Sequence, residues 1–219
     1  MDWLLNIKAF IFDLDGTLID SEKAHLKAWS EALSVFLQDF DINLVQKHFG
    51  KSGREIAFLI LQDEMKAEQC EKIKDQIFDT LLSTDVEPMP CAISLLELLK
   101  RRNIKTGVAS SHYSERIIRI LKHFNMLDFF DVIVGLDEVT KPKPSPELLL
   151  KALRKLDVSP AVAAYIGDSP YDVLTALNAG CYSILIKTYP RVNLRKSRVF
   201  PNLVVKSLCE LYREIRLYI

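Results

Sequence analysis

The residues best suited to chemistry in this sequence are two aspartates, Asp13 and Asp15, which directly follow an apolar run. In an extended chain, side chains two positions apart point to the same side, so both carboxylates can face one point. Two acids at the end of a buried strand are costly unless a cation offsets their charge. Gly16 allows the chain to turn sharply after them. The pattern predicts a site for a divalent metal and a phosphate, and therefore phosphoryl chemistry.

Two later segments carry groups that can bind a phosphoryl oxygen. Ser110 follows the apolar stretch 105–109, where its hydroxyl and the N–H groups of the next helix can donate hydrogen bonds. A serine in that position is also typical of a simple helix cap. In the proline-rich loop 141–146, a lysine held in place can neutralise a phosphoryl group and an aspartate nucleophile. Of Lys141 and Lys143 we select Lys143, because it leads directly into the next helix start.

A second pair of acids, Asp168 and Asp172, lies near the carboxyl end of the chain. Asp168 ends an apolar stretch and Asp172 follows one helical turn later, so both can face the same point. Oxygen-rich coordination without a histidine cluster favours Mg²⁺ over zinc. The alternative is that Asp168 only caps the helix that follows.

The elements that must position these groups alternate between strands and helices. Apolar stretches predict five strands, and helical spacing of apolar residues predicts helices between them. This alternation indicates an α/β fold, a Rossmann-like parallel sheet flanked by helices on both sides. The carboxyl ends of parallel strands meet at one edge, so the four polar segments should converge there. The predicted strands are 7–12, 105–109, 131–134, 161–166 and 182–186.

One long segment interrupts the alternation and contains no convincing strand. Leu26, Trp29, Leu33 and Phe36 recur at helical spacing, as do apolar residues further along the segment. We therefore predict a small all-helical cap domain at 20–86, inserted after the first strand. The α/β core domain then comprises residues 1–19 and 87–219.

Composition excludes several classes of protein. The formal net charge of the 219 residues is zero, so no overall basic field favours nucleic acid. Apolar runs are short, and the amino-terminal residues lack a basic start and a cleavage site, so we expect no membrane span and no signal peptide. The scattered cysteines suit reduced thiols, and we expect a cytoplasmic protein. These cysteines are Cys70, Cys91, Cys181 and Cys209.

The motifs together resemble those of the haloacid dehalogenase superfamily of hydrolases with a helical cap. They are Asp-Leu-Asp-Gly-Thr at 13–17, Ala-Ser-Ser at 109–111, Lys-Pro-Ser-Pro-Glu at 143–147 and Gly-Asp-Ser-Pro-Tyr-Asp at 167–172. The resemblance implies that Asp13 is the nucleophile and Asp15 the general acid and base. It implies that Ser110 and Lys143 hold the phosphoryl group. Mg²⁺ would be bound by Asp13, the backbone carbonyl of Asp15, and Asp168, with support from Asp172.

The cap and the loops around the site should select the substrate. The start of the insert resembles that of β-phosphoglucomutase-like members, which points to His25, and residues 50–54 resemble a specificity loop. We predict substrate contacts from Ser111, His25, Lys51 and Arg54, although a packed His25 and solvated basic residues are the simpler alternatives.

Two features outside the motifs differ from the pattern of the family. Family members commonly have Pro-Gly after the cap, whereas Cys91 follows Pro90 here. A basic loop contains Arg191, Arg195, Lys196 and Arg198. We expect it to be solvated, and the alternative is an electrostatic guide for an anionic substrate.

Three functions fit these residues. The first is a Mg²⁺-dependent phosphatase that hydrolyses a small phosphorylated metabolite, similar in layout to phosphoglycolate phosphatase. The second is a phosphosugar mutase; Thr17 favours the hydrolase, because the mutases that this cap resembles often have valine there. The third is a sensor that binds without catalysis, which the intact acids and lysine disfavour. We expect a monomer or a weak homodimer, with no nucleic-acid or membrane partner.

Overall fold

The structure is a computed structural model that describes residues 2–189 and 199–218. The chain divides into two compact units. The sheet unit comprises Met1–Ile19 and Pro88–Ile219, and the helical unit comprises Asp20–Glu87. The basic loop that contains Arg191 and Arg198 lies outside the described residues.

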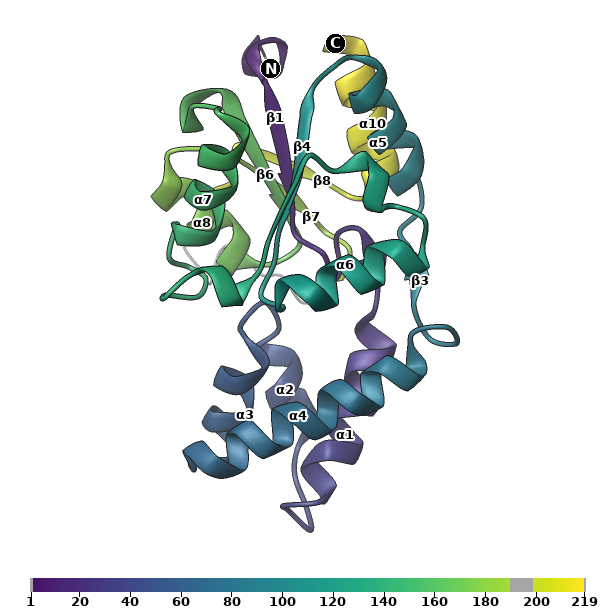
Figure 1. Cartoon of the computed structure of the whole chain (residues 1–219), viewed down its shortest axis with the longest axis vertical. Coiled ribbons are helices and arrows are strands. Elements are labelled where there is room, and N and C mark those ends of the chain that lie inside the picture. Colours follow the sequence, from purple (N-terminus) through teal and green to yellow (C-terminus); the bar gives the residue numbers. More distant parts are fainter. Residues whose placement is uncertain (1, 190–198, 219) are drawn as a thin grey trace. The chain divides into compact units, whose positions relative to one another are not determined.

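The sheet unit is built on a six-stranded sheet with the order β5-β4-β1-β6-β7-β8, in which all neighbouring strands are parallel (Figure 1). Phe12 of the central β1 pairs with Val108 of β4 and Ile166 of β6. The predicted α/β class is confirmed, and β8 is a strand that the sequence analysis missed. The strands are β1 (Ala9–Phe12), β4 (Lys105–Ala109), β5 (Val132–Val134), β6 (Ala163–Gly167), β7 (Tyr182–Ile186) and β8 (Leu203–Val205).

Helices cover both faces of this sheet. Figure 1 shows α7 and α8 on one side of the strands and α5 and α10 on the other. Leu149 and Leu153 of α7 belong to a buried cluster with Ile11 of β1 and Tyr165 of β6. The helices are α5 (Ala92–Arg101), α6 (Ser114–His123), α7 (Glu147–Leu156), α8 (Pro170–Ala179) and α10 (Leu208–Tyr218), with short 3₁₀ turns η1 (Asp2–Asn6), η2 (Leu127–Phe129), η3 (Leu136–Glu138) and η4 (Pro160–Val162).

The helical unit contains α1 (Glu22–Ser34), α2 (Ile42–Lys47), α3 (Gly53–Leu61) and α4 (Glu64–Leu81). Its core gathers the predicted apolar face of α1, including Trp29 and Leu33, against Val45 and Ile56. Side-chain caps at Asp41, Ser52 and Asp63 begin the second, third and fourth helices. Two short strands, β2 (Ile19–Asp20) and β3 (Glu87–Pro88), pair where the chain passes between the units.

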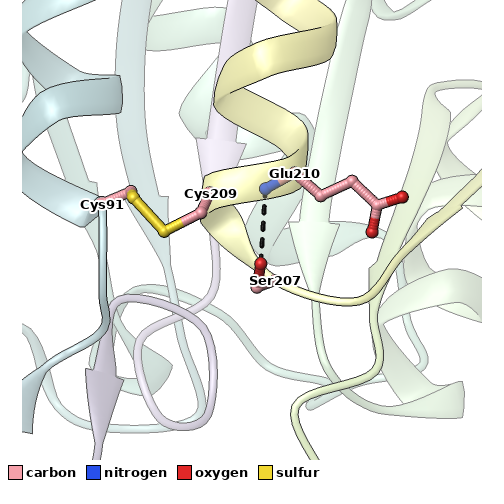
Figure 2. The surroundings of a disulfide bond; sticks show 4 residues. All are labelled: Cys91, Ser207, Cys209 and Glu210. Atoms are coloured by element: carbon pink, nitrogen blue, oxygen red, sulfur yellow. Dashed lines mark hydrogen bonds between the residues drawn. A yellow bond between two sulfur atoms is a disulfide. The ribbon is translucent and has the colours of Figure 1, made fainter.

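Cys91 and Cys209 form a disulfide that joins the start of α5 to the first turn of α10 (Figure 2). The prediction that these two cysteines are reduced thiols is wrong for this structure. They are 118 positions apart, so spacing gave no indication of the bond. Cys91 also has a left-handed backbone, with φ of 65°, at the position where the family commonly has glycine.

The other two cysteines, Cys70 and Cys181, are free and buried. Burial raises the pKa of Cys70 to about 11 and that of Cys181 to about 12. Because the thiolate is the reactive form, both side chains behave as small apolar groups at neutral pH. Within the described residues, no helix combines the length and the apolar character needed to cross a bilayer.

Candidate active site

Lys143 lies at the centre of the candidate site, between two carboxylates of the sheet unit. Its Nζ is 2.8 Å from Oδ1 of Asp13 and 2.8 Å from Oδ1 of Asp172. The lysine is 1% exposed, and both aspartates are buried. A buried cation held between two acids is stable only because its charge is balanced locally. Residues 130 positions apart in the chain therefore form one charged cluster at an edge of the sheet.

The strand ends and helix starts position this cluster. Asp13 directly follows β1, and its N–H donates to Ile166 O of the neighbouring β6 at 2.8 Å. Asp172 lies in the first turn of α8, where its Oδ2 accepts from the Ser169 hydroxyl at 2.6 Å and from the Ser169 N–H at 3.0 Å. This capping box leaves Oδ1 of Asp172 directed at Lys143. The lysine loop is anchored by Asn178, whose side chain donates to Pro144 O at 2.9 Å.

A third carboxylate, Asp168, completes an acidic group. Asp13, Asp168 and Asp172 each offer an oxygen, and these oxygens lie within 4.8 Å of one another. Gly16 has a φ of 70°, and a Cβ on it would collide with the Asp168 carboxylate. The turn after β1 thus requires glycine for two reasons, its conformation and the close approach of Asp168. Three carboxylates at this spacing are the hard oxygen donors that suit Mg²⁺.

The electrostatics of the cluster follow from burial. The pKa of Asp13 is raised to about 6, because burial and the Asp172 charge together outweigh the lowering effect of Lys143. Burial alone would lower the pKa of Lys143, but attraction to Asp13 and Asp172 outweighs it and holds that pKa well above its usual value. Both pKa values are therefore raised. Lys143 has two anionic partners that favour its charged form, whereas Asp13 faces a second anion as well as a cation.

The raised pKa of Asp13 predicts a pH-dependent stability in metal-free buffer. A carboxyl whose pKa is higher in the folded state stabilises the fold below about pH 4, and this contribution is lost as pH rises through about 6. The neutral variant Asp13→Asn should therefore be more stable than the wild type at pH 7.5, by about 2–3 kcal/mol, and no more stable at pH 4. Urea unfolding with EDTA at both pH values measures this difference. A variant that is less stable at pH 7.5 would contradict the expected sign.

Ser110 and Ser111 lie on the loop between β4 and α6. Ser110 is buried, and its N–H donates to Val134 O of β5 at 3.2 Å. Ser111 is half-buried beside it. Because β4 neighbours β1 in the sheet, this loop and Asp13 lie at adjacent strand ends. The hydroxyl of Tyr165 donates to Ala109 O at 2.6 Å and ties the end of β4 to β6.

His112 is a residue of this loop that the sequence analysis missed. Its Nε2 lies 2.5 Å from Oδ2 of Asp15, so the imidazole and the carboxylate share a hydrogen bond. The signal available in the sequence was its position two residues after Ser110, in the same turn at the end of a strand. A single histidine without a spacing pattern was not enough to connect it to Asp15.

The other predicted substrate residues belong to the helical unit, and each has partners there. His25 is buried and stacks on Phe78, with ring centroids 4.2 Å apart. Lys51 lies 3.4 Å from Glu55. Arg54 pairs with Glu64 at 3.1 Å on the surface. The Arg54–Glu64 pair is exposed, and surface ion pairs of this kind contribute only about 0–1 kcal/mol.

The sequence matches known proteins along most of its length. Residues 10–186 match the family model described as "Haloacid dehalogenase-like hydrolase". "Putative pyrophosphatase PpaX" of Caldanaerobacter subterraneus subsp. tengcongensis is 32% identical, over 97% of this chain and 96% of its own. Phosphoglycolate phosphatase of Aquifex aeolicus is 32% identical over 82% and 84% of the two chains. Beta-phosphoglucomutase of Bacillus subtilis is 34% identical over 81% and 82%.

Solved structures agree with these relatives. A hydrolase from Pseudomonas syringae has a TM-score of 0.86 and 26% identity, over 96% of this chain and 98% of that one. The family model runs from the second residue of β1 to the end of β7 and covers all four motifs of the candidate site. The chain therefore belongs to the haloacid dehalogenase-like hydrolases, the family that its motifs resemble.

Proposed function

We propose that this enzyme is a Mg²⁺-dependent phosphatase that hydrolyses a small phosphorylated metabolite through an aspartyl-phosphate intermediate. The observation that carries the proposal is the Lys143 ammonium, 2.8 Å from the Asp13 carboxylate inside a buried acidic cluster. A nucleophile that must approach a phosphate dianion needs nearby positive charge, and Lys143 supplies it beside the Asp13 carboxylate.

The reaction takes place in two steps. The Asp13 carboxylate attacks phosphorus in line, the bond to the leaving oxygen breaks, and Asp15 gives its proton to that oxygen. Asp15 then takes a proton from water, which attacks the aspartyl phosphate and releases phosphate and the free Asp13 carboxylate. Ser110 donates to a phosphoryl oxygen from the adjacent strand end. Lys143 offsets the charge on the phosphoryl oxygens in both steps.

The carboxylates of Asp13 and Asp168, with the backbone carbonyl of Asp15, would hold the Mg²⁺. When bound, the ion offsets negative charge on the phosphoryl oxygens. Asp172 supports the site differently, since one of its oxygens is held by Ser169 and the other by Lys143. We assign it the role of fixing Lys143, in addition to the support of the Mg²⁺ site that the family resemblance implies.

Selection of the leaving group is assigned to the helical unit acting as a cap, through His25, Lys51 and Arg54, and to Ser111. A lid of this kind excludes water and reads the part of the substrate that is not phosphate. The basic residues favour a substrate with a second anionic group.

A screen of phosphorylated metabolites tests the proposal. The purified enzyme, with Mg²⁺ or with EDTA, is offered 2-phosphoglycolate, sugar phosphates, pyrophosphate and 4-nitrophenyl phosphate, and released phosphate is measured. We expect Mg²⁺-dependent release from at least one monoester. If only pyrophosphate is cleaved, the substrate is a phosphoric anhydride and the monoester assignment is wrong. If no compound releases phosphate, the proposal is overturned.

The mutase alternative is favoured by the similarity to beta-phosphoglucomutase. It uses the same Asp13 chemistry, but a sugar hydroxyl replaces water as the acceptor of the phosphoryl group. Incubation with β-glucose 1-phosphate separates the two, because a mutase forms glucose 6-phosphate and the hydrolase forms glucose and phosphate.

Cytoplasmic location and a monomer or weak homodimer are further parts of the proposal. If the protein is in a reducing compartment, we expect Cys91 and Cys209 to be free thiols there. Rapid alkylation of cell extracts measures this.

A further inference from the structure

We infer that His112 is a positioning residue, which holds the Asp15 carboxylate in the orientation required for proton transfer to the leaving group. The inference rests on the proposed function, since it assigns a role within that reaction. Its starting point is the 2.5 Å contact between Nε2 of His112 and Oδ2 of Asp15. This distance is shorter than the usual range of about 2.7–2.9 Å for a charge-assisted N–H···O bond, so the ring nitrogen and the carboxylate oxygen are in direct contact with no room for water between them.

The exposure of the two side chains differs in a way that suits these roles. The Asp15 side chain is 28% exposed, so a substrate can reach it, whereas the His112 side chain is 12% exposed. The imidazole is therefore mostly enclosed by protein and contacts the acid. A proton donor with a partly exposed side chain can occupy several rotamers, and a fixed partner reduces that freedom.

The backbone of His112 is itself held by the next strand end. The carbonyl oxygen of His112 accepts from the N–H of Leu136 at 2.8 Å. Two residues on, the Ser114 N–H donates to the Asp137 carboxylate at 2.6 Å, and the Gly135 N–H donates to the Ser114 hydroxyl at 3.1 Å. Three hydrogen bonds to residues 135–137 thus fix the loop on the carboxyl-terminal side of Ser111.

Glycine at position 135 makes this close approach possible. A Cβ there would lie 2.6 Å from the carbonyl oxygen of His112, which is too close for any side chain. The hydrogen bonds from Ser114 also lower the pKa of Asp137, against the effect of its burial, so this carboxylate stays charged and keeps its bond to the loop. The loop is therefore built to keep one conformation.

The same short loop also begins with Ser110, which we assign to the phosphoryl group. Residues 110–112 would then set the phosphoryl position and the direction of the proton donor together. Small errors in the placement of a reacting group can cost about 10²-fold in rate, so the loss of this link should be visible in kinetics.

The test uses the dependence of the rate on the leaving group. An alkyl phosphate such as glycerol 2-phosphate needs a proton on the departing oxygen, whereas 4-nitrophenyl phosphate releases a stabilised anion that needs little help. We expect His112→Ala to lower kcat/KM for the alkyl ester by about 10- to 100-fold and for the nitrophenyl ester by less than about 3-fold. His112→Gln, which retains a donor of similar reach, should recover most of the loss. His112→Asn, which is too short, should not recover it.

Controls separate this role from a structural one. His123→Ala removes an exposed histidine at the end of α6 and should leave both rates within about 2-fold of the wild type. In an Asp15→Asn background, His112→Ala should add no further loss on the alkyl ester, because the two residues act as one unit. Equal losses on both esters, or additive losses in the double variant, would overturn the inference.

A spectroscopic measurement tests the contact without any substrate, so its failure is distinct from failure of the proposed function. In proton NMR, the His112 ring N–H should give a low-field resonance that disappears in His112→Gln and in Asp15→Ala. Its absence from the wild type would show that the hydrogen bond does not form. If the resonance is present but no phosphate ester is hydrolysed, the contact exists and the role assigned to it is wrong.

Discussion

Asp13→Asn is expected to lower kcat for phosphate-ester hydrolysis by at least about 10⁴-fold, because the amide cannot form the acyl phosphate. The variant should remain folded, since Asn keeps the shape of the side chain and its Oδ1 can still accept from Lys143. The substrate should also still bind, because Ser110 and Lys143 are unchanged. The loss is thus expected in kcat, and the comparison is made under saturating substrate with Mg²⁺.

Chemical trapping of the intermediate makes this prediction specific to Asp13. Borohydride reduces an acyl phosphate to an alcohol, so quenching during turnover should convert Asp13 to homoserine, which mass spectrometry detects in its peptide. Asp39→Asn, a matched change at an exposed residue of the helical unit, should retain full activity and the trapped product. If Asp13→Asn keeps the kcat of the wild type, or if another aspartate is trapped, the nucleophile is a different residue.

Lys143→Met is expected to cause the largest loss of stability among the site variants, about 3–5 kcal/mol in metal-free buffer at pH 7.5. Methionine fills a similar volume but leaves Asp13 and Asp172 buried at close range without a cation. Domains of this kind are stable by only about 5–15 kcal/mol, so a change of this size is a large fraction of the total. Chemical denaturation of the two proteins measures it.

Activity should fall with the same change by about 10²- to 10³-fold, because the charge that faces the phosphoryl group is gone. Lys141→Met is the matched control, since Lys141 is an exposed lysine two positions away in the same loop. It should change stability by less than about 0.5 kcal/mol. The double variant Lys143→Met with Asp172→Asn should regain part of the lost stability, because it removes one of the two unpaired acids. Equal effects of the two lysine changes would contradict the central position of Lys143.

Much of the fold could be predicted because strand signals and polar groups coincide in this sequence. Each predicted strand appears in the sheet, although β1 and β6 begin two residues later than expected. The Ser169-Pro170 start of α8 and its end at Gly180 follow local capping rules, which act over a few residues. The strand β8 was missed because three residues, Leu203–Val205, carry too little pattern to distinguish a strand from a loop.

The residues of the candidate site could be predicted from the sequence, but the contacts between their side chains could not. The topology rule brings strand ends together, and this is enough to place Asp13, Lys143 and Asp172 in one region. It does not say which oxygen of Asp172 is held by Ser169 and which by Lys143. The contact from His112 to Asp15 and the bond from Cys91 to Cys209 both join distant segments through single residues. Such contacts depend on three-dimensional placement, which no local spacing encodes.

The left-handed backbone at Cys91 has a consequence for how this sequence can evolve. Replacement of Cys91 by glycine would relax the backbone at that position, yet it would leave Cys209 as a half-buried thiol that can form a covalent link to another molecule. Loss of Cys209 first would instead leave a left-handed backbone at a non-glycine residue that no longer bonds to α10. Where the disulfide is closed, neither single replacement is neutral, so we then expect the two positions to be inherited and lost as a pair.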